Sequence, residues 1–181
     1  MIKIEHIEVS GIIPAIRGMR NPMNSWNLSD TKIDEKGNVV IGENDLELMC
    51  SLISAGSSHR KFMRMIQVTM DITAPFYWWK QFDTYKVGTV ANSCSTMHKI
   101  MDKPFEKNDF SFENNLTAEE YFDKLLEALN DHREAYINYD ELLKEEKIKK
   151  EITKKRIFNS LIQLLPSSYN QKRTIQINLE S

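Results

Sequence analysis

The two ends of the chain alternate hydrophobic and polar positions, as strands with one buried face do. Residues 1–9 place isoleucine or valine at alternate positions, which predicts a half-buried strand. Residues 174–178 alternate in the same way and predict a closing strand. A short apolar run near residue 40 follows the turn sequence Lys36-Gly37-Asn38.

The middle of the chain shows the three- to four-residue hydrophobic spacing that is typical of helices. Residues 45–70 show a helix pattern that is broken at Gly56-Ser57-Ser58, after which a hydroxyl can cap a second helix or a turn. Pro75 suits the first turn of a second helix over residues 76–88, whose aromatic residues and Val87 recur on one side. Residues 11–30 show no clean period, so we expect a loop there.

A further helix is predicted from Thr117, whose hydroxyl can form a capping box with Glu120. An apolar stripe from Tyr121 to Leu129 follows. Residues 144–156 are nearly all charged and predict a solvated helix face with ion pairs between residues four apart, rather than a nucleic-acid site.

Composition narrows the class of protein. With 181 residues, the chain is long enough for one α+β domain with a substantial core. A net charge of −2 gives no basic field, so we expect no nucleic-acid partner. No apolar run approaches the roughly 20 residues of a membrane span, and residues 1–6 do not resemble a leader. We therefore expect a cytoplasmic protein, in a bacterial or phage-infected cell.

Two cysteines, Cys50 and Cys94, indicate reduced thiols rather than a disulfide framework. Neither has histidines at metal-ligand spacing, so we expect no metal site. Cys94 could be a nucleophile, and a small buried thiol is the alternative. Glycine-rich dinucleotide and phosphate-loop motifs are absent from the sequence.

The order of motifs in the second half of the chain provides a family resemblance. Ser58-His59 precedes Ala74-Pro75, and two further segments, Lys80-Gln81-Phe82 and Thr84-Tyr85-Lys86, come later. They align with the family pattern from Ala74-Pro75 onward without an insertion or a deletion. This order resembles that of the flavin-dependent thymidylate synthases, in which the last two segments read Arg-Gln-Trp and Arg-His-Arg. Thr89 takes the place of a family serine.

The next family segment reads Asn-Glu-x-Ser. With one inserted residue, the segment from Asn92 to Ser95 falls on it; without the insertion, Asn92 takes the glutamate position and Cys94 the serine position. The amino-acid sequence of these segments also resembles that of a divergent branch of such proteins in phage and prophage genomes.

A second patch near residue 180 agrees with this resemblance. The family has an arginine four residues before a proline and later an Asn-x-Arg, and this chain has Ile162 before Pro166 and then Asn178-Leu179-Glu180. In the family both arginines hold the nucleotide phosphate, so other cations must substitute here. The candidates are Arg60, Arg64, Lys172 and Arg173, together with Arg17 or Arg20 if the loop 11–30 delivers them; a solvated loop is the alternative.

The resemblance implies an α+β fold, a single flavin-dependent thymidylate synthase-like domain over residues 1–181 with long helices packed on an antiparallel sheet. The family continues into another helix where this chain ends, so we expect that helix to be absent. The resemblance also implies a homo-oligomer, a tetramer, whose sites are shared between subunits. It implies FAD as a cofactor and a nucleotide or other small molecule as a ligand.

Carried over position by position, the resemblance predicts two groups of site residues, while the catalytic residues stay unknown. The cofactor-binding group is His59, Gln81, Thr84, Tyr85, Lys86 and Asn92. The nucleotide-binding group is Thr89, Ser93, Cys94, Ser95 and Arg173. Simpler roles stay open for several of them: Asn92, Ser93 and Ser95 could cap a helix, and Trp78 and Trp79 could lie in the core or a subunit interface.

The implied activity is flavin-mediated methyl or hydride transfer to deoxyuridylate with NADPH and a folate. The alternative is a non-catalytic phage or prophage protein, a pseudoenzyme that uses the same cleft to bind or sequester a nucleotide.

Overall fold

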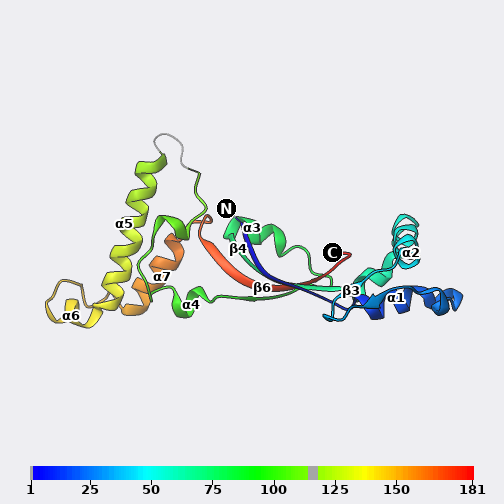
Figure 1. Cartoon of the computed structure of the whole chain (residues 1–181). Coiled ribbons are helices and arrows are strands. Elements are labelled where there is room, and N and C mark those ends of the chain that lie inside the picture. The colour runs from blue at the N-terminus through cyan, green and yellow to red at the C-terminus, as the bar shows by residue number, and fades with distance from the viewer. Residues whose placement is uncertain (1, 114–117) are drawn as a thin grey trace. The chain divides into compact units, whose positions relative to one another are not determined.

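A computed structural model describes residues 2–113 and 118–181. The chain divides into two compact units (Figure 1). Unit 1 comprises residues 1–3, 73–82 and 93–173, and unit 2 comprises residues 4–72, 83–92 and 174–181. Each unit has a hydrophobic core of its own. The prediction that residues 1–181 form a single domain stays a prediction.

Within residues 2–113 and 118–181, six strands form two sheets. Four of them pair in the order β1 (Lys3–Ser10), β4 (Gln67–Pro75), β6 (Asn170–Asn178) and β5 (Val90–Ser93) in an antiparallel sheet. The strands β2 (Lys32–Ile33) and β3 (Val39–Val40) form a small antiparallel hairpin. The predicted α+β class with an antiparallel sheet is therefore confirmed.

Unit 2 is built on α1 (Ile12–Arg20), α2 (Glu43–Ser54) and the 3-10 helix η3 (Arg60–Met65), which pack around one core. Two short 3-10 helices, η1 (Asn21–Met23) and η2 (Trp26–Leu28), follow α1. The core of unit 2 consists of Ala15, Ile16, Met19, Met49, Phe62 and Ile66.

Residues 11–30 were expected to be a loop, and this expectation is wrong for α1. The helix buries Ala15, Ile16 and Met19, which repeat at helical spacing. Pro14 conceals this period but lies in the first turn, where its missing N–H would have no partner in any case.

The helix pattern predicted over residues 45–70 is wrong for residues 67–70, whereas residues 60–65 form the 3-10 helix η3. Helix α2 ends at Ser54, Gly56 adopts a φ of 106°, and residues 67–75 form β4. Valine, threonine and isoleucine recur in this segment, and their β-branched side chains favour a strand. The strand at residues 1–9 is present, but almost all of its residues are exposed rather than half-buried.

Unit 1 contains the remaining helices, α3 (Phe76–Phe82), α4 (Thr96–Lys99), η4 (Lys107–Asp109), α5 (Ala118–Ile137), α6 (Tyr139–Lys144) and α7 (Lys154–Leu164). Helices α5 and α7 lie side by side (Figure 1). They cover a core of Ile100, Met101, Phe105, Phe110, Phe122, Leu129 and Leu161.

Three predictions for unit 1 and its borders need correction. Helix α3 ends at Phe82, so Val87 lies outside it and is exposed. Residues 145–153 are not helical, because α6 ends at Lys144 and α7 begins at Lys154. Tyr121 is exposed rather than part of the buried stripe of α5. The predicted cap Thr117 lies outside the described residues.

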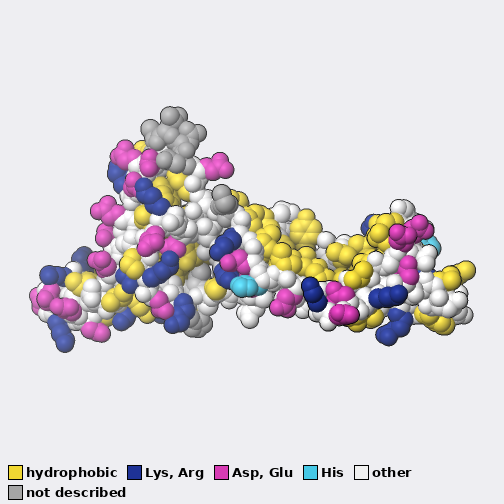
Figure 2. All heavy atoms as spheres, viewed as in Figure 1, with side chains coloured by type: hydrophobic (Ala, Val, Ile, Leu, Met, Phe, Trp, Pro, Cys, Tyr) yellow, Lys and Arg dark blue, Asp and Glu magenta, His cyan; other side chains and the backbone are white. Residues whose placement is uncertain are grey.

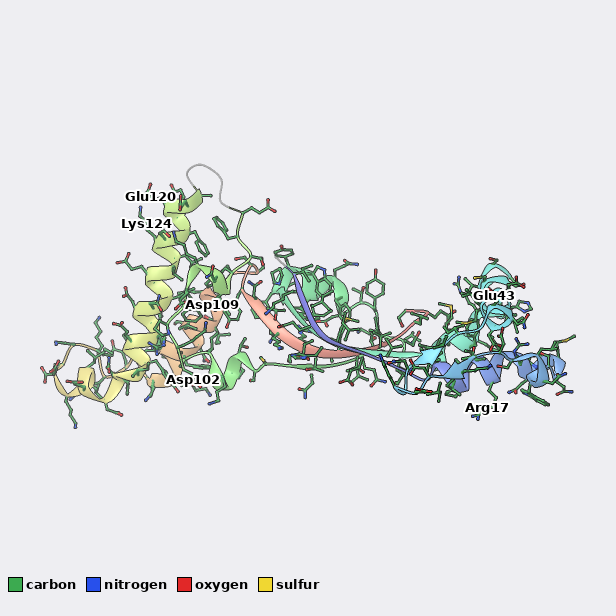
Figure 3. All side chains as sticks on the ribbon, in the orientation of Figure 1. Arg17, Glu43, Asp102, Asp109, Glu120 and Lys124 are labelled. Atoms are coloured by element: carbon green, nitrogen blue, oxygen red, sulfur yellow. The ribbon has the colours of Figure 1, made fainter. Side chains whose placement is uncertain are left out.

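The helices of unit 1 carry interleaved acidic and basic side chains, as Figure 2 shows over α5 to α7. Lys124 and Glu120, one turn apart on α5, form an ion pair at 2.7 Å (Figure 3). In the described part of the chain, no helix is both long enough and apolar enough to cross a membrane.

Candidate functional site

Unit 2 contains a cavity of about 400 Å³ between the turn after α3, the helix η3 and the end of β6. Its lining is polar and carries three cationic side chains and one side-chain carboxylate. The residues that line it are Arg60, Arg64, Thr84, Tyr85, Lys86, Val87, Asn178, Glu180 and Ser181.

The turn over residues 83–88 is held against β6 by a close backbone approach. Gly88 adopts a φ of 72°, and a Cβ at this position would collide with the side-chain amide of Asn178. Only glycine combines this conformation with this contact at low cost. The Thr89 hydroxyl donates a hydrogen bond to the Tyr85 carbonyl and closes the turn. The sequence thus places residues 84–87 on one wall of the cavity.

Two arginines of η3 share one carboxylate at the opposite wall. Arg60 Nε lies 3.2 Å from Glu180 Oε1, and Arg64 Nε donates to Glu180 Oε2. The hydrogen bond from Arg64 lowers the pKa of the Glu180 carboxyl most, burial opposes it, and Arg60 adds to the lowering. Glu180 also raises the pKa of the Arg64 guanidinium. Glu180 and Arg64 are therefore both charged around neutral pH.

Lys86 supplies the third cation of the cavity. It is exposed, and within the described residues no carboxylate pairs with it. Because Glu180 offsets only one of the three positive charges, the cavity keeps an excess of positive charge. An anionic ligand is the chemistry that this excess favours.

A separate cluster in unit 1 contains other residues from the sequence prediction. Gln171 donates from Nε2 to the Cys94 carbonyl at 2.7 Å and accepts from Arg173 Nε at 3.0 Å. The Arg173 guanidinium lies 4.3 Å from the ring centre of Trp79, which is 1% exposed and donates to the Gln171 carbonyl. Trp79 is therefore a core residue, as one of the two alternatives held.

The predicted site residues divide between these places. Thr84, Tyr85 and Lys86 line the cavity of unit 2, Thr89 closes its turn, and His59 precedes Arg60 at the start of η3. Asn92 is an exposed residue of β5 in the same unit. The other five, Gln81, Ser93, Cys94, Ser95 and Arg173, belong to unit 1. Their functional roles stay predictions.

Two simpler expectations have clear outcomes. Ser95 caps α4, accepting a hydrogen bond from the Met97 N–H at 3.2 Å, whereas Ser93 and Asn92 lie in β5. The alternative of a buried thiol at position 94 is wrong, because Cys94 is exposed, as is Cys50. Among the described residues, no group of histidine, cysteine or carboxylate side chains could hold a metal ion.

Two contacts of the motif segment 178–180 did not follow from the sequence: the close approach of Asn178 to Gly88 and the pairing of Glu180 with both arginines. The sequence contained a signal for the pairing of Glu180. A glutamate stands where the resemblance places an arginine, and residues 60 and 64 are arginines. Arg20, a candidate phosphate ligand, is instead buried against Asp45. Arg17 is exposed on α1 (Figure 3).

No protein-family model and no curated protein sequence matches the chain. Among solved structures, it is similar to thymidylate synthase X (ThyX) from Helicobacter pylori with FAD and dUMP, with a TM-score of 0.65 and 16% identity, over 98% of this chain and 78% of that one. A second structure of the flavin-dependent thymidylate synthase from that organism, complexed with FAD and dUMP, gives 0.62 and 15%, over 97% and 78%. The chain therefore has the fold of the flavin-dependent thymidylate synthases, as the order of its motifs predicted.

Proposed function

We propose that this chain is a divergent flavin-dependent thymidylate synthase-like protein that binds FAD, a pyrimidine nucleotide or both at the cavity of unit 2. One observation carries the proposal. The cavity joins residues 84–86 and 178–180, the two segments in which the resemblance places ligand contacts, although they lie far apart in the sequence. The solved structures that share the fold hold FAD and dUMP, which supports the same ligand class here.

The residues of the cavity suit a phosphate-bearing ligand with a flat ring. Lys86 and the two arginines offer charged donors, and Tyr85 offers an aromatic surface. Its volume of about 400 Å³ lies near the lower end of the usual range for small-molecule sites. That size suits one nucleotide moiety better than a whole dinucleotide, so the rest of a bound FAD would extend beyond this cavity. When bound, the flavin would supply the hydride chemistry.

A non-catalytic nucleotide-binding protein of phage or prophage origin is the second candidate. It is favoured by the absence of arginine from the two positions at which the resemblance places phosphate-holding arginines. Ile162 packs against the hydrophobic core of unit 1, and Glu180 is itself paired with two arginines. A guanidinium fork gives two charge-assisted hydrogen bonds that neither side chain can supply. The ordinary reaction would thus lack two of its phosphate contacts.

We also propose that the protein is a homotetramer with sites shared between subunits. The edge strand β1 exposes Ile4, Ile7 and Val9, and Met65 and Tyr77 are about half exposed. Apolar surface of this kind is commonly buried between subunits. Light scattering that finds a monomer at micromolar concentration would contradict this assembly. The two exposed thiols suit a reducing compartment such as the cytoplasm of a bacterial or phage-infected cell.

Ligand titration tests the proposal. The purified protein is titrated with FAD, followed by flavin fluorescence, and with dUMP, followed by calorimetry. Lys86→Ala should weaken binding about 10- to 100-fold, the worth of one charged hydrogen bond, without a change in melting temperature. Lys36→Ala, an exposed lysine in the turn between β2 and β3, is the matched control and should bind as the wild type does.

Failure of the wild type to bind either ligand would refute the proposal, and wild-type affinity in Lys86→Ala would refute the site. The two candidate functions separate in a turnover assay with FAD, NADPH, a methylene-donating folate and dUMP. Mass spectrometry that detects methylated nucleotide identifies an enzyme. Binding without turnover favours the non-catalytic protein.

A further inference from the structure

The arginine–glutamate cluster of the cavity is layered. The side chains of Arg60 and Arg64 are 43% and 58% exposed, whereas that of Glu180 is 13% exposed. The carboxylate therefore lies beneath the two guanidinium groups. A ligand that enters from solvent would meet the arginines before it meets the glutamate.

The carboxylate uses only part of each guanidinium group. Both contacts are made through Nε, one to each oxygen of Glu180. Within the described residues, the terminal Nη groups of Arg60 and Arg64 donate no hydrogen bond. The terminal Nη groups of both arginines are thus available at the cavity, and Glu180 holds both guanidinium groups in place.

Two guanidinium groups side by side repel each other unless an anion lies between them. Glu180 meets this need from below, through a hydrogen bond to each arginine. Its backbone is fixed in turn, because the Glu180 N–H donates to the Asn178 side-chain oxygen at 3.0 Å and Asn178 is buried. The carboxylate is therefore a rigid support rather than a flexible side chain that fills the cavity.

We propose that Arg60 and Arg64 form a clamp for the phosphate or pyrophosphate group of a ligand, and that Glu180 is the positioning residue that aligns the two guanidinium groups. The inference rests on the proposed function in that it assigns the phosphate end of the ligand within the same cavity. Planar guanidinium forks match phosphate oxygens with parallel charge-assisted hydrogen bonds. Lys86, on the other wall, completes the positive surface as a point charge.

The opposite role for Glu180 is that of an internal competitor, which would occupy the place of the phosphate. The two roles predict opposite changes in the affinity for an anion when the charge of Glu180 is removed. Removing the negative charge makes the cavity more positive, so a competitor model and simple electrostatics both predict tighter binding of any anion. The positioning role predicts weaker binding despite that added positive charge.

The test uses inorganic pyrophosphate as the probe and calorimetry of the full chain. Replacing both forks in Arg60→Lys/Arg64→Lys keeps the charge and should weaken pyrophosphate binding about tenfold or more, since an ammonium group cannot form the paired hydrogen bonds. Glu180→Gln should weaken pyrophosphate binding about threefold or more. Each guanidinium group that is no longer aligned by Glu180 loses part of its charged hydrogen bond to the probe. Arg17→Lys, an exposed arginine of α1, is the control and should bind as the wild type does.

Tighter binding in Glu180→Gln would overturn the positioning role, and unchanged binding in the double lysine variant, or no binding in the wild type, would overturn the clamp. Thermal unfolding of each variant verifies that the fold is retained. FAD and dUMP titrations in the same proteins keep the two proposals apart. If pyrophosphate binds through the arginines but neither nucleotide binds, the clamp stands and the proposed function fails; if a nucleotide binds equally in the double lysine variant, the clamp alone fails.

Discussion

Unit 2 contains two arginine–carboxylate clusters of similar composition, one enclosed and one at a cavity. In the enclosed cluster, Arg20 Nε lies 2.6 Å from Asp45 Oδ1, and their side chains are 4% and 0% exposed. In the cavity cluster, Arg60 and Arg64 share Glu180 with both guanidinium groups in solvent. Equal chemistry thus occurs in two opposite environments within one unit.

In the enclosed cluster, both oxygens of the carboxylate have hydrogen-bond partners. The second oxygen of Asp45 accepts from the Ser29 hydroxyl at 2.8 Å and from the N–H groups of Asp30 and Thr31. Arg20 also donates to the Ser25 carbonyl at 3.3 Å. These bonds fasten the segment after α1 to the first turn of α2. Burial favours such pairing of the carboxylate, since an unpaired buried charge is strongly unfavourable.

The cavity cluster differs in the exposure of its arginines. Its arginines keep terminal N–H groups toward solvent, where an ion pair contributes little to stability. Composition alone therefore does not distinguish a structural ion pair from a recognition site. The number of unused hydrogen-bond donors at an accessible surface distinguishes them.

The largest expected effect comes from breaking the enclosed cluster. Asp45→Asn leaves Arg20 buried without its counter-charge, so we expect a loss of about 3–5 kcal/mol in the free energy of unfolding. Denaturant-induced unfolding followed by circular dichroism measures it. Arg17→Ala, on the exposed side of the same helix, is the control and should change the free energy by less than about 0.5 kcal/mol. A loss as small in Asp45→Asn as in this control would show that the enclosed cluster is not structural.

The sequence predicted the elements that carry regular periods. The closing strand β6, the helix after Pro75 and the α+β class were all predicted from alternation, helical spacing and motif order. Pro14 interrupts the period of α1, so the sequence predicts a loop there. The apolar residues at the start of β4 continue those of α2, so the sequence predicts a helix over residues 67–70. In both cases the neighbouring elements, which supply the burying surface, decided the structure.

The candidate site was predictable only in part. The resemblance predicted residues 84–86 as cofactor contacts, and they line one wall of the cavity, but it gave no partner for Glu180. Its pairing with η3 depends on contacts between residues more than a hundred positions apart, which no local pattern reveals. For the same reason Arg20, read as a possible phosphate ligand in a loop, is the buried partner of Asp45.

A smaller effect is expected from the backbone that shapes the cavity. Gly88→Ala introduces a Cβ at positive φ and against Asn178, whereas Gly37→Ala introduces one at a φ of 85° with open space around it. Gly37→Ala should therefore destabilise the protein by about 1–2 kcal/mol from conformation alone. Gly88→Ala should exceed that value by about 1–3 kcal/mol of overpacking and also weaken ligand binding. Equal losses in the two variants, measured by denaturant unfolding, would mean that the cavity wall does not depend on this close approach.

The smallest effect, and the one that compares the two carboxylates directly, is expected on acidification. Burial tends to raise the pKa of Asp45, but hydrogen bonds from Thr31, Ser29 and Arg20 outweigh it and lower the pKa far below the ordinary value of about 3.9. Because the folded pKa lies below the unfolded one, the stability from this group is complete above about pH 4 and is lost as the pH falls further.

Glu180 also has a lowered pKa, yet its arginine partners are exposed and solvent screens the interaction. The melting temperatures of the wild type and Glu180→Gln should thus fall in parallel between about pH 5 and about pH 2. Asp45→Asn should start lower at neutral pH and fall less steeply, since its folded state has no Asp45 carboxylate to protonate. A profile flattened equally by Glu180→Gln would show that the cavity carboxylate stabilises the fold as the enclosed one does, and exposure would no longer distinguish the two clusters.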